Sequence, residues 1–367
     1  MGGISGDLPE EDLARMLRRG EELVPAEDTV TRARLLLDHA WMAWRFEREA
    51  EMADPARGGL ELARRTDDVS LLSSALDAIS AVAWIEIRYR DAVEYARERL
   101  DLLEGARGGA QIGIEHSDAL HMMVESLVAA GELRPAAEYA KQARELDLSV
   151  GAVYSGWARG LLPAFFLGQW ESALRMADAV RESWAAADRP PIAALSAALA
   201  CAGAILGYRG DQDASEDWFR FANGAAPAHG GQSSGVAMLE ADVNLHQGRI
   251  ADALALSDSV STHKMWWRSA YAATRAEAMV RAHDQRAADV ISQAGGRIGD
   301  HRYAQGVLLR ARGLHEGDET HLRHALSLFE EIGCPYQAAR TGWLLGGEAR
   351  KQAERTFTSL GATLPPD

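Results

Sequence analysis

The chain has 367 residues and a formal net charge of −15, from 39 Lys and Arg against 54 Asp and Glu. This acidity argues against a surface for duplex DNA or for anionic lipid, since both need a basic footprint. A hydrophobic content of 47% excludes a disordered chain, and with only two cysteines no disulfide framework is expected.

The N-terminal residues lack a basic region followed by an apolar run, so we expect no signal peptide. Charged residues interrupt every apolar stretch before it reaches ~18 residues, so we expect no transmembrane helix. Together with the sparse cysteines, these features predict a cytoplasmic protein.

No segment shows the alternation of a strand, and short Gly, Pro or Asp punctuation separates one helical pattern from the next. Helices are expected, in chain order, near Glu10–Arg19, Val30–Phe46, Pro55–Arg65, Val69–Arg88, Arg90–Leu103, Ile114–Ala130, Pro135–Leu146, Tyr154–Leu167, Trp170–Ala186, Ile192–Tyr208, Asp213–Asn223, Ser234–Gln247, Ile250–Val260, Trp266–Ala282, Arg286–Ala294, Tyr303–Leu314, Glu319–Ile332, Tyr336–Leu345 and Ala349–Ser359.

One phrase recurs along the chain, most clearly at Gly168-Gln169-Trp170-Glu171-Ser172-Ala173. A glycine ends one helix, a large apolar residue follows two positions later, and two small residues four apart share a face of the next helix. The first small residue of each copy stands at Ala92, Ala136, Ala173, Ser215, Ala253 and Ala287. This irregular period of about 34–45 residues, with two helices in each copy, predicts an all-α solenoid of stacked helical hairpins.

Each copy of this phrase marks the joint between the two helices of a hairpin. The joints resemble those of tetratricopeptide repeats, closely from Val69 to Ile291 and more loosely before and after this range. The resemblance implies a single superhelix of about eight hairpins over residues 1–367. Residues 1–29 would be an N-terminal lead-in and capping helix, and residues 336–367 would be C-terminal capping helices.

A second resemblance lies in Ala325–Thr341 and in Ala353–Ala362. Both segments resemble the C-terminal repeat arm of large ATP-dependent LuxR-type (MalT-like) transcriptional regulators of actinobacteria. In that family the arm is the sensor and protein-contact segment between an ATPase and a DNA-binding helix-turn-helix. This sequence has no phosphate-binding loop and no basic recognition helix, so we expect either the sensor arm alone or a free-standing relative, without direct nucleic-acid contact.

The tetratricopeptide resemblance also implies which positions line the concave face. They lie fifteen and eleven residues before the first small residue of each joint. Trp84 lies eight residues before the small residue Ala92. The candidate binding residues are Asp77, Trp84, His121, Glu125, Leu162, Met238 and Asp242. Such an acidic and apolar groove suits a protein or peptide with basic and apolar residues, or an amphipathic small molecule; the acids could equally be solvated surface charges.

No catalytic constellation and no cofactor motif stands out, so no enzyme, no cofactor and no metal are expected. His321 and His324 are three residues apart beside acidic residues, but a third ligand is unspecified. The favoured hypothesis is a non-catalytic sensor or interaction module. A helical enzyme or accessory subunit with a cavity site, and a scaffold that only bridges proteins, remain alternatives, and the oligomeric state is open.

Overall fold

The computed structural model describes residues 9–106, 110–149, 151–188, 193–225, 234–256 and 267–366. Every regular element within these ranges is a helix, and they contain no strand. The all-α fold class that the sequence predicts is therefore confirmed.

In chain order the helices are α1 (Glu10–Leu23), α2 (Thr29–Arg45), the short 3-10 helix η1 (Glu49–Glu51), α3 (Ala53–Ala63), α4 (Val69–Ile85), α5 (Tyr89–Glu104), α6 (Ala110–Ala130), α7 (Leu133–Ser149), α8 (Val153–Ala158), α9 (Leu161–Phe166), α10 (Trp170–Ala186), α11 (Ala193–Tyr208), α12 (Gln212–Gly224), α13 (Ser234–His246), α14 (Ile250–Leu256), α15 (Trp267–Arg281), α16 (Ala287–Gly295), α17 (Arg302–Glu316), α18 (Glu319–Ile332), α19 (Pro335–Leu345) and α20 (Gly347–Leu360).

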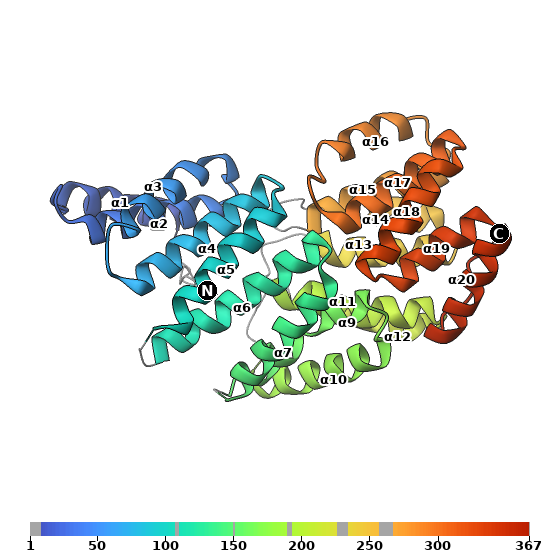
Figure 1. The fold of residues 1–367 in the computed structure, drawn as a ribbon, viewed down its shortest axis with the longest axis horizontal. Coiled ribbons are helices and arrows are strands. Elements are labelled where there is room, and N and C mark those ends of the chain that lie inside the picture. Colours follow the sequence, from blue (N-terminus) through green and yellow to red (C-terminus); the bar gives the residue numbers. More distant parts are fainter. Residues whose placement is uncertain are drawn as a thin grey trace. The chain divides into compact units, whose positions relative to one another are not determined.

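The chain divides into two compact units, Met1–Ser126 and Leu127–Asp367, with the boundary inside α6. Neighbouring helices pack as hairpins within each unit (Figure 1): α4 on α5 in the first, and α11 on α12, α17 on α18 and α19 on α20 in the second. A single hairpin cannot bury its apolar face, so stacked neighbours complete the core. One continuous superhelix with capping roles for residues 1–29 and 336–367 stays a prediction.

Aspartates begin several of these helices. Asp28, Asp68 and Asp211 each accept a hydrogen bond from the backbone N–H three residues later, at 3.0, 3.0 and 3.3 Å. Asp318 accepts one from Thr320 N at 2.8 Å. These caps satisfy backbone donors that the first helical turn leaves unpaired, and so define where α2, α4, α12 and α18 start.

The joints between hairpins match the recurring phrase. Its first small residue is buried in every copy, at Ala92, Ala136, Ala173, Ser215, Ala253 and Ala287. The second small residue is buried at Ala96, Ala140 and Ala177, while Ser257 lies outside the described residues. Small side chains at these positions let the two helices of a hairpin approach closely.

The glycine of the joint has a backbone conformation that other residues rarely adopt. Gly131, Gly168, Gly210 and Gly248 have φ of 81°, 73°, 83° and 74°. Glycine reaches this left-handed region without a steric penalty, which ends one helix and turns the chain toward the next. In the joint before α5 the same place is taken by Ile87, with φ of 54°.

One segment predicted as a single helix forms two helices. The segment expected as a single helix near Tyr154–Leu167 consists of α8 and α9, with a break at Arg159 and Gly160. The cause is Pro163, which has no N–H to donate to the carbonyl of Arg159 and whose ring crowds that carbonyl.

The C-terminal part of the second unit lies along its joint glycines. A Cβ added to each of these glycines would come close to a residue of this C-terminal part. On Gly131 it would lie 2.6 Å from Arg302 Cβ, and on Gly168 it would lie 2.7 Å from Pro335 Cγ. On Gly210 it would lie 3.1 Å from Thr363 Cγ2, and on Gly248 it would lie 2.7 Å from Pro366 Cγ. The backbone N–H of Thr363 also donates to the carbonyl of Tyr208 at 2.8 Å. The joint glycines therefore provide both the turn and the space in which this segment packs.

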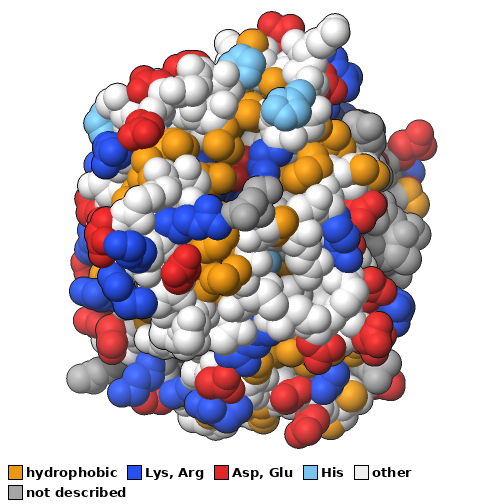
Figure 2. Space-filling view, turned by 90° about the vertical axis from the view of Figure 1, so that its right-hand side faces the viewer, with side chains coloured by type: hydrophobic (Ala, Val, Ile, Leu, Met, Phe, Trp, Pro, Cys, Tyr) orange, Lys and Arg blue, Asp and Glu red, His pale blue; other side chains and the backbone are white. Residues whose placement is uncertain are grey.

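Two surface properties bear on function. No helix in the described ranges is long and apolar enough to cross a lipid bilayer. On the face that Figure 2 shows, apolar side chains form small patches that Lys, Arg, Asp and Glu side chains interrupt.

Candidate functional site

In the first unit, acidic side chains of α4 and α6 converge on one buried arginine of α5. The guanidinium of Arg99, which is only 2% exposed, donates hydrogen bonds to Asp77 at 2.8 Å, to Glu115 at 2.8 Å and to Asp118 at 2.9 Å. Its Nε also donates to the hydroxyl of Ser73 at 2.9 Å. A guanidinium suits this role because its five N–H groups can serve several acceptors at once.

Burial affects the acids of this cluster unequally. It raises the pKa of Asp77 to about 6, against the opposing charge of Arg99 and with the charge of Asp118 adding to the rise. Asp118 is buried too, but the charge of Arg99 holds its pKa well below the ordinary value. One turn further along α6, His121 Nε2 lies 3.7 Å from Glu125 Oε1. Burial therefore makes the carboxyl of Asp77 easier to protonate than an exposed aspartate, whereas Arg99 makes that of Asp118 harder to protonate.

In the second unit, four charged side chains from four helices form a buried network. Arg340 of α19 pairs with Asp242 of α13 and, at 2.8 Å, with Glu277 of α15. Arg310 of α17 donates two hydrogen bonds to Glu277 Oε2, at 2.7 and 3.1 Å. All four side chains are at most 3% exposed.

Neutral polar groups complete this network. Asp242 also accepts hydrogen bonds from the hydroxyl of Tyr208 at 2.6 Å and from the amide of Gln337 at 2.9 Å. Burial alone would favour the neutral acid, yet the charges of Arg340 and Arg310 hold the pKa of Asp242 below its ordinary value. Burial acts on Glu277 in the same way, and the same two arginines also lower its pKa. The two negative charges of the carboxylates are thus matched by the two positive charges of the guanidiniums inside the second unit.

The structure buries six of the seven side chains that the sequence places on the concave face. Asp77, Glu125 and Asp242 are at most 6% exposed, as are Trp84, Leu162 and Met238, and the side chain of His121 is 25% exposed. Trp84 donates from Nε1 to the hydroxyl of Ser126 at 3.0 Å. The expected open groove is filled at Asp77 and Asp242 by arginines of the same chain. A ligand-binding role for these seven residues stays a prediction.

A cleft of about 820 Å³ does open in the second unit. It is lined by α7, by the turn between α9 and α10, and by α18, α19 and α20. Its residues include apolar Leu167, Leu326 and Pro335 and the charged Arg134 and Glu138. The volume is within the range of about 300–1,000 Å³ that is usual for ligand pockets.

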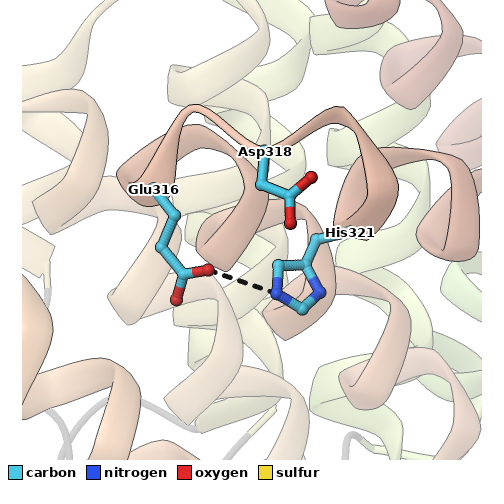
Figure 3. A group of neighbouring side chains, drawn as sticks. All are labelled: Glu316, Asp318 and His321. Carbon is cyan, nitrogen blue, oxygen red and sulfur yellow. Dashed lines mark ion pairs between the residues drawn. The ribbon is translucent and has the colours of Figure 1, made fainter.

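Figure 3 shows Glu316, Asp318 and His321 at the turn between α17 and α18, the only group within the described ranges whose spacing could hold a metal ion. His321 Nε2 lies 3.2 Å from Glu316 Oε2, and Asp318 caps α18. Both contacts are those of an ordinary helix end. His324, which the sequence pairs with His321, is not a member of this group.

Sequence reasoning missed Arg99, Glu277, Arg310 and Arg340, and it also missed the cleft. A signal for the arginines was present: Arg310 stands in the stripe of α17 that buries Val307, Leu308 and Ala311. A charged residue on a buried helical stripe requires a buried partner. The cleft has no comparable signal, because helices far apart in the sequence form it.

No protein-family model and no curated protein sequence matches the chain. Among solved structures, a phAimR–ligand structure superposes with a TM-score of 0.51 at 12% identity, over 95% of this chain and 99% of that one. The Rap protein complexed with competence and sporulation factor gives a TM-score of 0.49 at 12% identity, over 96% of this chain and 95% of that one. The likeness to phAimR extends over nearly the whole of both chains, and the fold is a tetratricopeptide-like α-solenoid.

Proposed function

We propose that the chain is a non-catalytic module that binds a protein, a peptide or an amphipathic small-molecule effector and responds by a shift in the arrangement of its repeats. The observation that carries this proposal is the buried network of Asp242, Glu277, Arg310 and Arg340. It joins α13, α15, α17 and α19, and its carboxylates are neutralised by arginines rather than presented to a substrate.

Such a network favours a conformational role. Buried ion pairs add little net stability compared with apolar packing, but breaking one is costly, so they can select one arrangement over others. An effector that binds one arrangement of the repeats more tightly than another shifts the population between them. The phAimR chain with a similar fold was solved with a ligand, which supports this function by analogy of fold.

The proposal is tested by thermal denaturation of the full chain against a panel of short peptides and amphipathic small molecules. A saturable rise in melting temperature that grows with ligand concentration is expected. Turnover in an activity screen, or metal bound in stoichiometric amount, would contradict the proposal and favour a helical enzyme or an accessory subunit with a cavity site.

The seven predicted side chains stay proposed binding residues within each unit: Asp77, Trp84, His121 and Glu125 in the first, and Leu162, Met238 and Asp242 in the second. His121 is the most exposed of them. His121→Ala should weaken effector binding without unfolding the chain, because its side chain is 25% exposed. His116→Ala, on the same helix, is the matched control. Equal binding by both variants would remove His121 from the site.

The C-terminal resemblance to LuxR-type regulators supports a further step, in which the module senses a signal for a transcriptional regulator. Coding segments for an ATPase and a helix-turn-helix beside this one, and altered transcription when the module is deleted, are the expected observations. A scaffold that only bridges proteins would instead give light-scattering evidence of a ternary assembly, with no effector in the thermal panel.

A further inference from the structure

The cleft of the second unit has an apolar floor. Leu167, Leu326, Pro335, Ala338 and Ala339 contribute to it. Small residues of α19 and α20 line this floor where the two helices approach closely, since a Cβ added to Gly342 would lie 3.0 Å from the carbonyl oxygen of Ala349. Apolar groups from outside would therefore meet small side chains of α19 and α20 beside Leu167, Leu326 and Pro335.

The rim of the cleft is acidic. Three glutamates, Glu138, Glu330 and Glu348, line it against one arginine, Arg134. Glu348 lies 3.2 Å from Lys351 Nζ, whereas Glu138 and Glu330 are exposed and make no ion pair within the described part of the chain. They come from different helices, α7 and α18.

We propose that this cleft docks a short peptide segment in which apolar side chains alternate with lysine or arginine. The apolar side chains would rest on the floor, and the cations would pair with Glu138 and Glu330. Charge complementarity at the rim favours this partner over an acidic one, because like charges brought together there are repelled. The inference rests on the proposed binding function and gives it a site away from the buried network.

The cleft also offers a route from docking to the repeat arrangement. Gly168, whose Cβ would stand 2.7 Å from Pro335 Cγ, lies in the turn between Leu167 and Gln169 that lines the cleft. Arg340 of the buried network follows Ala338 and Ala339 directly on α19. A segment bound on this floor would contact α19, the helix that carries Arg340.

The test is fluorescence anisotropy of the full chain with a short labelled peptide of alternating lysine and leucine. A matched peptide of glutamate and leucine is the comparison. Saturable binding of the lysine peptide is expected, weakened by added salt because exposed charges are screened. Equal binding of the two peptides would overturn the proposal.

Substitutions in the cleft test whether the lysine peptide binds there. The pair Glu138→Lys and Glu330→Lys should weaken the lysine peptide about tenfold, as expected for reversing two exposed charges. Ala338→Trp, which fills the floor, should also weaken it. The control pair Glu145→Lys and Glu182→Lys changes the net charge equally, at exposed positions outside the cleft, and should leave binding within about twofold.

The remaining outcomes are distinct. Equal loss in the control pair would show a general charge effect and overturn the cleft as the site. Self-association that disappears with Ala338→Trp would assign the cleft to a second copy of the chain and also overturn the proposal. Full binding by the cleft variants leaves the proposed function intact and removes only the cleft, whereas no response to any peptide or small molecule refutes the proposed function itself.

Discussion

At the scale of single residues, a few arginines are buried and paired with buried carboxylates. Arg99 serves three carboxylates in the first unit, and Arg310 and Arg340 serve two in the second. Each stands on a helix whose other buried residues are mainly apolar or small. The helices that meet at these arginines are therefore held in one arrangement by charge as well as by packing.

Removing one of these arginines should be costly. Arg340→Ala leaves Asp242 and Glu277 buried with fewer partners, and we expect a loss of about 3–5 kcal/mol in the free energy of unfolding. Urea denaturation measures it. Arg323→Ala removes an exposed pair with Glu319 and should cost less than about 1 kcal/mol. Similar losses for the two variants would show that the buried network is not special.

Two buried histidines make stability depend on pH. Burial lowers the pKa of His246 to about 4 and that of His301 to about 3, from the ordinary 6.5. The unfolded chain therefore binds more protons below pH 6.5, so stability falls as the pH falls from about 6.5 toward 4, by up to about 1.4 kcal/mol per pH unit for each histidine.

Mutation can show which histidine causes this dependence of stability on pH. His246→Gln should reduce the dependence of the unfolding free energy on pH between 6.5 and 4, measured by denaturation at several pH values. His315→Gln, at an exposed position, should leave it unchanged. An unaltered slope in the His246 variant would exclude this histidine as a source.

At the scale of elements, the joint between hairpins sets both a turn and a contact. Gly131, Gly168 and Gly248 each combine a positive φ with a close approach by a residue from the C-terminal part of the chain. The joint before α5 differs, because Ile87, a β-branched residue, takes the left-handed conformation there in place of glycine. The helices thus stack in one register partly because space for the C-terminal segment is reserved at the joints.

Alanine substitutions separate these two requirements. Gly317→Ala meets no atom within 4 Å at φ of 66°, so it should cost only the conformational penalty of about 1–2 kcal/mol. Gly168→Ala adds a contact at 2.7 Å with Pro335 Cγ and should cost clearly more. Chemical denaturation measures the free energy of unfolding of both variants. Equal losses would mean that Pro335 can shift away from the added methyl group at no cost.

At the scale of the whole molecule, the second unit is closed by contacts of its own C-terminal residues. Pro366 packs at Gly248, Thr363 Oγ1 lies 3.1 Å from His246 Nε2, and Arg209 donates to the carbonyl of Leu360 at 3.3 Å. These contacts join helices near the middle of the chain to its last residues. The stability of the second unit should therefore depend on this short segment.

Removing the residues after Gly361 tests this closure. We expect a lower melting temperature and faster hydrogen exchange in the turns after α11 and α13, because the contacts of Thr363 and Pro366 are lost. Thr358→Ala, which removes an exposed hydroxyl bonded within α20, is the control and should change neither. Unchanged exchange in the truncated chain would assign the closure to α19 and α20 alone.

The sequence by itself determined the helices, their joints and the repeated hairpin. These depend on neighbours in the chain: the aspartate caps, the glycine that turns at each joint, and small residues four apart at Ala173 and Ala177. Even the break at Pro163, which the predicted helix ignored, has a local cause that could have been read. Local preferences are strong enough here to fix the type of fold.

Only the tertiary structure decided what the acids on the inner helices do and where a cleft opens. Asp77 meets Arg99 across 22 residues of sequence, and Asp242 meets Arg340 across 98. Helical spacing places a side chain on a face of its own helix, but its partner depends on how the hairpins stack. That stacking is set by packing summed over the whole unit, so neither the buried network nor the cleft between α7 and α18–α20 is written in any single stretch of the chain.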